Sequence, residues 1–279
     1  MLFSVVSLLM LASIFGLPLM ATWGLVHLAS GSGWVWPALL IAPLVYTLCF
    51  VLTAGALSLP FQSGIIAGKF PRDLRHPVYR KRRFYGLCWT SVYYFKPLYF
   101  LCLTIPWLKW ATFRLFGYRG QMDFTIYPDT WIRDLPLLEL GRGAYIANRA
   151  TLGTNIPLSN GKVLVERVKV GNGALIGHLT MLAAGVEVGD RTEIESGCAL
   201  GLRVRVGAGC SLGGTVTLNH FSQVGHNVQI GASSCIGFRA TVQDGVRLAS
   251  SSRVPDHSRL ITVQPDALRA QGTHERTSR

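Results

Sequence analysis

Aliphatic residues recur at every sixth position through the second half of this 279-residue chain. The series begins at Leu140, ends at Leu260 and has twenty-one consecutive members without a miss. A period of six fits neither an α-helix nor an alternating strand. It is typical of a solenoid of short strands and turns, in which three hexads form one triangular coil. The series predicts about seven coils, stacked about 4.8 Å apart like neighbouring strands.

Two other positions of each hexad are also restricted. The residue after the aliphatic is usually glycine or alanine, which we interpret as a tight corner. The residue four places after the aliphatic is small or branched and should also point inward, as at Ala150, Val168, Ala174, Thr180, Val186, Thr192, Cys198, Val204, Cys210, Val216, Ser222 and Val228. The pattern is weakest over residues 154–163, where Pro157 would interrupt strand pairing, so we expect a local irregularity there.

The N-terminal region is apolar, and Lys69 is the first lysine or arginine. Residues 2–28 and 34–61 are apolar runs, each longer than the roughly 20 helical residues that span a bilayer. The short turn between them predicts an antiparallel transmembrane hairpin. A cleaved signal peptide is the alternative, but the first four residues lack the basic start that such a peptide needs.

A basic segment follows the hairpin. Residues 69–119 contain eleven lysines or arginines and the single acid Asp73. This excess marks the cytoplasmic side, so we expect a multi-pass protein of a bacterial inner membrane with its C-terminal domain in the cytoplasm. The aromatic residues of the segment favour an anionic membrane lipid over nucleic acid as its partner. Residues 84–116 are interrupted by Pro97 and Pro106 and form either interfacial helices, which we favour, or a third, broken membrane segment.

These observations divide the chain into four parts. Residues 1–68 form the transmembrane hairpin, 69–134 the basic aromatic interfacial segment, 135–260 the solenoid and 261–279 a polar tail. The six cysteines include no Cys-x-x-Cys pair, which argues against a zinc or redox site. We therefore expect reduced thiols and no metal.

Three histidines share one position in the hexad. His178, His220 and His226 each lie two residues after an aliphatic, where a side chain faces outward. Counted in hexads, His220 is seven and His226 eight after His178, which places the three on different faces of a triangular coil. Asp244 lies eighteen residues after His226, so its carboxylate should stack beside that imidazole and could fix its tautomer.

The repeat over residues 135–260 resembles that of the hexapeptide-repeat acyltransferases. The resemblance implies an all-β left-handed parallel β-helix, here preceded by a transmembrane α-helical hairpin and interfacial helices. It also implies a homotrimer with active sites between adjacent β-helices, and acyl-CoA or acyl-ACP (acyl carrier protein) as co-substrate without a tightly bound cofactor. The order of apolar helices, basic segment and solenoid is loosely similar to the membrane-bound C-terminal part of polylysine synthetase-type enzymes.

Residues 222–231 resemble the catalytic stretch of the acyltransferases that make lipid A. The resemblance implies that His226 is a general base that accepts a proton from an acceptor hydroxyl or amine, with Asn227 beside it in the motif. Asn219 and His220 are candidates for lining the substrate cleft, and Gly213 and Gly214 for contact with a pantetheine arm. Arg253 and Arg259, near the final coil of the resemblance, are candidate phosphate ligands, although arginines at such positions are more often simply solvated.

Two other classes of protein remain to be weighed. The γ-class carbonic anhydrases share the solenoid, but their zinc site needs histidines stacked on one face, which the intervals of 42 and 6 residues do not provide. A non-enzymatic, membrane-anchored solenoid scaffold is the stronger alternative. A scaffold would not need the His226 motif, so the sequence favours a membrane-anchored acyltransferase.

Overall fold

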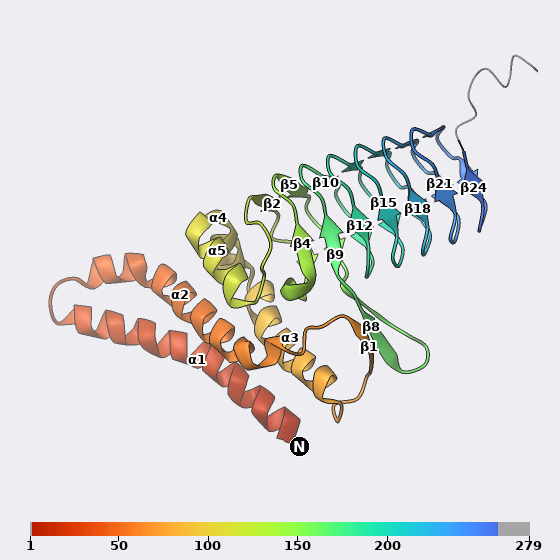
Figure 1. Ribbon diagram of the computed structural model, residues 1–279. Coiled ribbons are helices and arrows are strands. Elements are labelled where there is room, and N and C mark those ends of the chain that lie inside the picture. The colour runs from red at the N-terminus through yellow and green to blue at the C-terminus, as the bar shows by residue number, and fades with distance from the viewer. Residues whose placement is uncertain (1, 262–279) are drawn as a thin grey trace, which may run out of the picture.

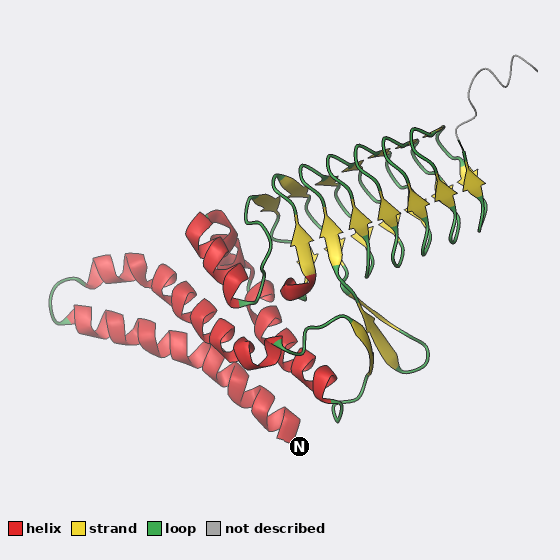
Figure 2. Cartoon of the chain, in the orientation of Figure 1, coloured by secondary structure: helices red, strands yellow, loops and turns green. Residues whose placement is uncertain are grey.

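The computed structural model describes residues 2–261, in which a group of helices is followed by a long triangular β-solenoid (Figures 1 and 2). The helices are α1 (Leu2–Ser30), α2 (Val35–Gln62), α3 (Pro77–Tyr94), α4 (Lys96–Thr104) and α5 (Pro106–Leu115). Of the polar tail predicted at 261–279, residues 262–279 lie outside the described residues. The predicted fold class, apolar helices followed by a parallel β-helix, is confirmed.

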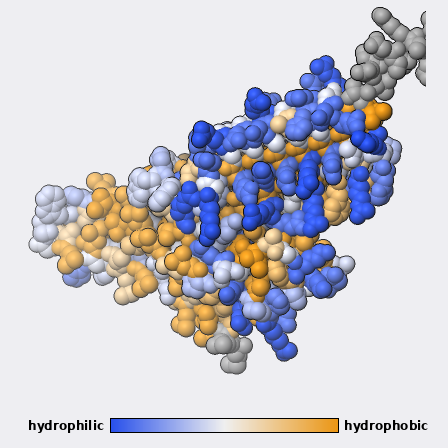
Figure 3. All heavy atoms as spheres, in the orientation of Figure 1, coloured by the Kyte–Doolittle hydropathy of each residue, from blue (hydrophilic) through white to orange (hydrophobic). Residues whose placement is uncertain are grey.

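Helices α1 and α2 form an antiparallel hairpin. Both are long and apolar enough to cross a membrane, and in their most apolar windows only 17% and 22% of the residues are buried. Their outward surface is apolar, whereas hydrophilic side chains cover the solenoid (Figure 3). The hairpin is therefore unlike the core helix of a soluble protein, which would be buried on most sides.

Prolines begin the three shorter helices. Pro77, Pro97 and Pro106 lie in the first turns of α3, α4 and α5, where a missing N–H costs nothing. Helices α4 and α5 have 9 and 10 residues, too short to cross a bilayer alone. Aromatic side chains from α3–α5 and the loop after them form the core of this region: Tyr85, Trp89, Tyr99, Phe113, Phe116 and Tyr118.

The solenoid consists of three parallel sheets with seven strands each. The first sheet contains β2 (Phe124–Ile126), β5 (Ala144–Ile146), β10 (Leu175–Ile176), β13 (Glu193–Ile194), β16 (Ser211–Leu212), β19 (Gln229–Ile230) and β22 (Arg247–Leu248). The second contains β3 (Trp131–Ile132), β6 (Thr151–Leu152), β11 (Met181–Leu182), β14 (Ala199–Leu200), β17 (Thr217–Leu218), β20 (Cys235–Ile236) and β23 (Arg253–Val254). The third contains β4 (Leu138–Leu140), β9 (Val168–Val170), β12 (Glu187–Val188), β15 (Arg205–Val206), β18 (Gln223–Val224), β21 (Thr241–Val242) and β24 (Arg259–Leu260).

The first coil begins before the six-residue series does. Strands β2 and β3 pair in parallel with β5 and β6, so the solenoid starts at Phe124 rather than at 135. Ile126 and Ile132 are six residues apart, but a 3₁₀ turn, η1 (Leu135–Leu137), lengthens the next step to Leu140. That insertion breaks the period and hides the first coil from the sequence pattern.

The expected irregularity near 154–163 is a β-hairpin that leaves the solenoid. Strands β7 (Asn155–Pro157) and β8 (Lys162–Val165) pair with each other, and β8 also pairs with β1 (Gly68–Pro71), both in antiparallel fashion. Leu158 and Leu164 keep the six-residue period yet belong to this excursion and not to the three sheets. The insertion therefore amounts to two hexads, which is why the periodicity passes through it unbroken.

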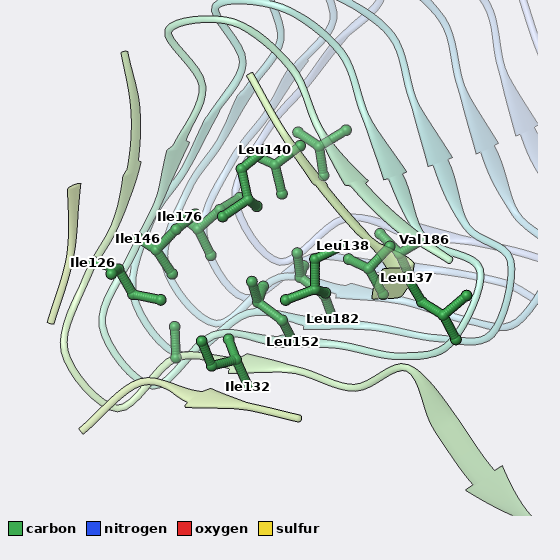
Figure 4. Close-up of a cluster of buried hydrophobic side chains, with 14 of the residues drawn as sticks. Ile126, Ile132, Leu137, Leu138, Leu140, Ile146, Leu152, Ile176, Leu182 and Val186 are labelled. Carbon is green, nitrogen blue, oxygen red and sulfur yellow. The ribbon is translucent and has the colours of Figure 1, made fainter. Parts of the chain in front are cut away.

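The side chains predicted to point inward do so. All twelve of these residues are buried, and so are the aliphatic residues of the six-residue series in the sheets except Leu248 and Leu260, which are partly buried. Figure 4 shows such side chains converging from the three sheets in the first coils, among them Ile146, Leu152, Ile176 and Leu182. Threonines in this position also bond the next coil, since Thr180 Oγ1 donates to the Glu195 carbonyl at 2.8 Å.

The small residue after each aliphatic has a different role from the one predicted. Left-handed backbone occurs two residues later, at glycines such as Gly173 or at residues such as Leu179 with φ 59°. The glycine next to the aliphatic is required by stacking instead, because a Cβ on Gly177 would lie 2.5 Å from the Glu195 carbonyl carbon of the next coil. The prediction that these residues are small because the chain turns there was therefore wrong. They are small because adjacent coils touch at this position.

A buried ion pair joins the helices to the first coil. Arg82 of α3 donates to Asp134 Oδ2 at 2.7 Å, and Thr154 donates to the same oxygen at 2.5 Å. Burial raises the pKa of Asp134, but the charges of Arg82 and Arg133 and the bond from Thr154 outweigh it and hold that pKa below its usual 3.8. The pair thus stabilises the fold above pH 3.8, and its contribution is lost as the pH falls through the lowered pKa.

We expect Asp134→Asn to lower the free energy of unfolding by about 3–5 kcal/mol, because it leaves Arg82 buried without its counterion. Asp129→Asn is the control, since Asp129 is half exposed and pairs with Lys96 at 3.5 Å on the surface. It should cost less than about 1 kcal/mol. Denaturant unfolding of both variants in detergent measures the difference, and equal losses would contradict the assigned role of Asp134.

Gly177→Ala should destabilise the solenoid by about 1–3 kcal/mol, because its methyl group would overlap backbone of the next coil. Gly214→Ala provides the comparison: the nearest atom to a Cβ there is 3.6 Å away, an ordinary contact. We expect that change to stay within about 0.5 kcal/mol. Thermal unfolding that ranked the two variants the other way round would refute the stacking explanation.

Candidate active site

A shallow groove of about 790 Å³ runs along the outer face of the third sheet and the corner after it. Two positions of each repeat line the groove. The residue just before the buried aliphatic lies on the outer face of the sheet, and the residue two places after the aliphatic lies at the corner. The charged and polar residues of the groove are Lys169, Glu187, Asp190, Arg205, Gln223, His226, Thr241, Gln243 and Asp244. His226 and Asp244, which the sequence placed together, both lie here.

The sheet face of the groove carries a ladder of alternating charges. Glu139, Lys169, Glu187 and Arg205 are successive cross-strand neighbours. Arg205 also forms an ion pair with Glu187 at 3.5 Å. The next neighbour of Arg205 in the sheet is the uncharged Gln223, which lies three residues before His226. The charged residues and His226 therefore line adjoining parts of the same groove.

Side chains of the corner cap main-chain N–H groups of the preceding coil. Asp190 Oδ1 accepts from the Asn172 N–H at 2.7 Å, and this bond lowers the pKa of Asp190. In the same way His226 Nδ1 accepts from the Ala208 N–H at 3.0 Å, and Asp244 Oδ1 accepts from the His226 N–H at 2.8 Å. Each of these side chains therefore fixes the main-chain N–H of the residue eighteen positions before it.

The bond from Ala208 determines the resting state of the His226 ring. A neutral imidazole whose Nδ1 accepts a hydrogen bond carries its proton on Nε2. Nε2 then acts as a donor, and its lone pair becomes available only if the proton moves to Nδ1 and the bond to Ala208 breaks. Such a bond contributes about 1 kcal/mol, so an acceptor could displace it.

Asp244 acts on His226 through the main chain. Asp244 lies next to His226, as the spacing predicted. Its Oδ1, however, accepts from the backbone N–H of His226 and not from the ring, and the ring tautomer is set by the Ala208 N–H. Asp244 also explains its neighbouring glycine, since a Cβ on Gly225 would lie 2.1 Å from Asp244 Oδ1. Asp244 is thus a positioning residue for this corner.

The backbone conformation of the corner accounts for asparagine at position 227. Its φ is 54°, in the left-handed region that asparagine tolerates better than most residues. It does not line the groove. A direct chemical role for Asn227 stays a prediction.

The other candidate residues lie at different places on the prism. Asn219 and His220 follow β17 at the corner of the second sheet, where His220 Nδ1 accepts from the Leu202 N–H at 2.8 Å. Gly213 and Gly214 follow β16 at the corner of the first sheet. Arg253 is the first residue of β23 in the second sheet. Arg259 is the first residue of β24 in the third sheet, where it is the cross-strand neighbour of Thr241. A single chain therefore brings together His226 and Asp244, with Arg259 just beyond them.

The three histidines occupy three different corners, as their spacing predicted. His178 follows β10 of the first sheet, His220 follows β17 of the second and His226 follows β18 of the third. Over residues 2–261, no group of three or more His, Cys, Asp or Glu side chains could hold a metal ion. Within one chain, the histidines therefore lack the stacking on one face that a carbonic anhydrase-like zinc site needs.

Sequence reasoning missed the charged ladder. Lys169, Glu187, Arg205, Gln223 and Thr241 each precede an aliphatic residue and recur every eighteen residues. That spacing, three hexads, is the signal that could have found them. It requires knowing which hexads share a sheet, and the hairpin insertion changes that assignment before Val170.

No model of a protein family matches this chain, and no curated protein does. Among solved structures, it is similar to a hexapeptide transferase family protein from Anaplasma phagocytophilum, with 21% identity, a TM-score of 0.34 and coverage of 50% of this chain and 87% of that one. Serine acetyltransferase from Neisseria gonorrhoeae shares 13% identity, with a TM-score of 0.26 and coverage of 80% and 74%. A UDP-N-acetylglucosamine acyltransferase from Bacteroides fragilis shares 16%, with a TM-score of 0.18 and coverage of 56% and 65%.

The chain's own repeat and its three parallel sheets define the class of protein: a hexapeptide-repeat β-solenoid. The solved structures it is similar to are transferases, among them acetyl- and acyltransferases.

Proposed function

We propose that this protein is a membrane-anchored acyltransferase that uses the groove on the third sheet. It would move an acetyl or longer acyl group from a coenzyme A or acyl carrier protein thioester to a hydroxyl or amine. The observation that carries the proposal is the position of His226. The residue selected by its sequence motif lies in the groove on the third sheet, where its ring accepts from the Ala208 N–H and its own N–H donates to Asp244.

His226 would act as the general base. The acceptor oxygen or nitrogen attacks the thioester carbonyl, and its proton passes to Nε2 of the imidazole. The carbon–sulfur bond then breaks, and the departing thiolate takes that proton. For this step the ring must release the Ala208 N–H and carry its resting proton on Nδ1, which acceptor binding would bring about.

The charges of the groove suit the proposed donors. Coenzyme A and the prosthetic group of acyl carrier protein both carry phosphate, and Lys169 and Arg205 are exposed cations on the groove face. Arg259 extends the same face by one strand.

A homotrimer would complete the groove. Its lining comes from one sheet and one corner, so the opposite side is open. A neighbouring copy could place another corner there, and Asn219, His220, Gly213, Gly214 and Arg253 are the candidates, since they lie on the other sheets and corners. This would reconcile their dispersal in one chain with the roles that the family resemblance implies.

The hairpin α1–α2 would anchor the protein. The start of α1 and the end of α2 lie on the side of the solenoid, next to the basic segment (Figure 1). The exposed cations of that segment include Lys69, Arg72, Arg75 and Arg80. This arrangement supports a solenoid on the cytoplasmic side, with α4 and α5 at the membrane surface. A cytosolic donor could then reach the groove.

A non-enzymatic scaffold is the second candidate, and one observation favours it. Leu175, Leu179 and Met181, around the corner after β10, are exposed apolar side chains of the solenoid. Exposed apolar residues at one corner suit a protein partner as well as a second copy. Release of free thiol from acyl-CoA or acyl carrier protein by the purified chain separates the two candidates, and its absence over a broad donor panel would favour the scaffold.

We expect His226→Asn to lower acyl transfer about a hundred- to ten-thousandfold while the protein stays folded. Asparagine removes the base yet keeps a capping oxygen, as Asn172 shows by accepting from the Arg142 N–H at 2.8 Å. The assay is thiol release, with circular dichroism as the check on folding. His178→Ala, at the first-sheet corner, is the control and should be mild. Wild-type turnover in His226→Asn would reduce His226 to a structural cap.

Asp244→Asn should reduce turnover only a few-fold, because its side-chain oxygen can still accept the His226 N–H. Asp244→Ala removes that acceptor and should cost more. Adding Asp244→Ala to His226→Ala should bring little further loss, since the two residues act as one unit. Steady-state kinetics of the four variants test this order, and independent, multiplying losses would contradict it.

The N-terminus and the solenoid should share the cytoplasmic side. Reporter fusions at residue 279, read with a cytoplasmic and a periplasmic enzyme, measure this directly. A fusion active only in the periplasm would overturn the topology and separate the groove from a cytosolic donor.

A further inference from the structure

A second cleft, of about 490 Å³, lies between the start of α1, helix α3 and the first coil. Its walls include Phe3 and Ser7 of α1, Arg83 and Thr90 of α3, and Arg133 just after β3. Figure 1 shows α3 lying between the hairpin and the solenoid. The cleft shares no lining residue with the groove of His226.

The cleft is cationic. Arg83 and Arg133 both line it, and none of the described residues that line it is acidic. The closest carboxylate in sequence, Asp134, already accepts from Arg82, Thr154 and Asn155 through Oδ2. Over the described part of the chain, no ion pair within 4.0 Å is formed by Arg83 or Arg133.

The guanidinium of Arg133 is held in place with unused donor capacity. It lies against Gly86 of α3, where a Cβ would be 2.7 Å from Arg133 Nη2. Its Nε is buried and has no hydrogen-bond partner among residues 2–261. Because Arg133 also lines the cleft, the charge of its guanidinium would attract an anion bound there.

The surroundings of the cleft are apolar on the side of the hairpin. Val5, Leu8 and Leu9 of α1 are 50%, 66% and 63% exposed, beside the wall residue Ser7. Tyr94 and Trp131 line the cleft with ring centroids 5.9 Å apart, and paired aromatics of this kind are typical of the membrane–water boundary. A ligand here would meet cations at one end and apolar surface at the other.

We propose that this cleft binds the phosphodiester of an anionic phospholipid, with the acyl chains lying along the exposed face of α1. Arg133 and Arg83 contact the phosphate, and Gly86 provides the room for the Arg133 guanidinium. The proposal rests on the membrane anchoring proposed above and is independent of acyl transfer. It goes beyond general attraction to a charged surface, because it assigns the head group to two named arginines.

The test titrates the full-length protein in neutral detergent with phosphatidylglycerol or phosphatidylcholine and counts bound lipid by native mass spectrometry. We expect saturable binding of phosphatidylglycerol and at least about a tenfold weaker affinity in Arg133→Gln. Arg80→Gln is the matched control, since Arg80 is an exposed cation of α3 outside the cleft. It should weaken binding by no more than about fivefold, the effect of one surface charge.

Gly86→Ala is a second, independent variant. Its methyl group would displace the Arg133 guanidinium, so lipid affinity should fall, while an alanine inside α3 should keep or raise stability. Equal affinities of Arg133→Gln and Arg80→Gln for phosphatidylglycerol would overturn the site. So would equal binding of phosphatidylcholine by the wild type.

Glycerol phosphate distinguishes the source of the phosphate. We expect millimolar glycerol phosphate not to compete with phosphatidylglycerol, because the acyl chains contribute to binding. Competition at the same concentration as the lipid would assign the cleft to a soluble phosphate ligand and refute the lipid proposal. Failure of the wild type to float with vesicles would refute the anchoring, whereas a failure of acyl transfer alone would leave lipid binding intact.

Discussion

Contact between the backbones of adjacent coils is the constraint on which the solenoid depends. Parallel strands bond each coil to the next, and at each corner the residue after the aliphatic lies against main chain of the following coil. Glycine occupies most of these positions, because a Cβ added to most of these glycines would overlap that main chain. The same proximity allows a corner side chain to reach an N–H of the preceding coil, as His226 and Asp244 do. Stacking therefore creates both the fold and the geometry of the candidate site.

Much of the fold could be predicted from the sequence because the solenoid repeats a local rule. Each aliphatic marks a strand end facing the core, so sheets, inward residues and the separate corners of His178, His220 and His226 follow from counting. The first coil could not be counted, since η1 lengthens the step before Leu140. The hairpin of β7 and β8 was visible only as an irregularity, because an insertion of whole hexads preserves the period while moving the chain away from the prism.

The candidate site was predictable in part, for a related reason. Spacing placed Asp244 beside His226, because eighteen residues is one coil. It did not show whether the carboxylate would meet the ring or the backbone, which depends on the distance between coils at the corner. Nor did it show the column of Lys169, Glu187 and Arg205, whose members are far apart in sequence and share no motif. Motifs report one coil at a time, whereas the groove spans several.

The stacked coils also act as a spacer between the helices and the groove. From β4, in the coil next to the helices, to β18, which precedes His226, there are four steps along the third sheet. At about 4.8 Å for each step, the histidine is held roughly 19 Å beyond the first coil. If the hairpin lies in a bilayer, an acceptor attached to a lipid must extend a comparable distance to be reached. Removing eighteen residues would shorten that reach by one step without altering any other coil, so under the proposed function the number of repeats would set which acceptors arrive at the site.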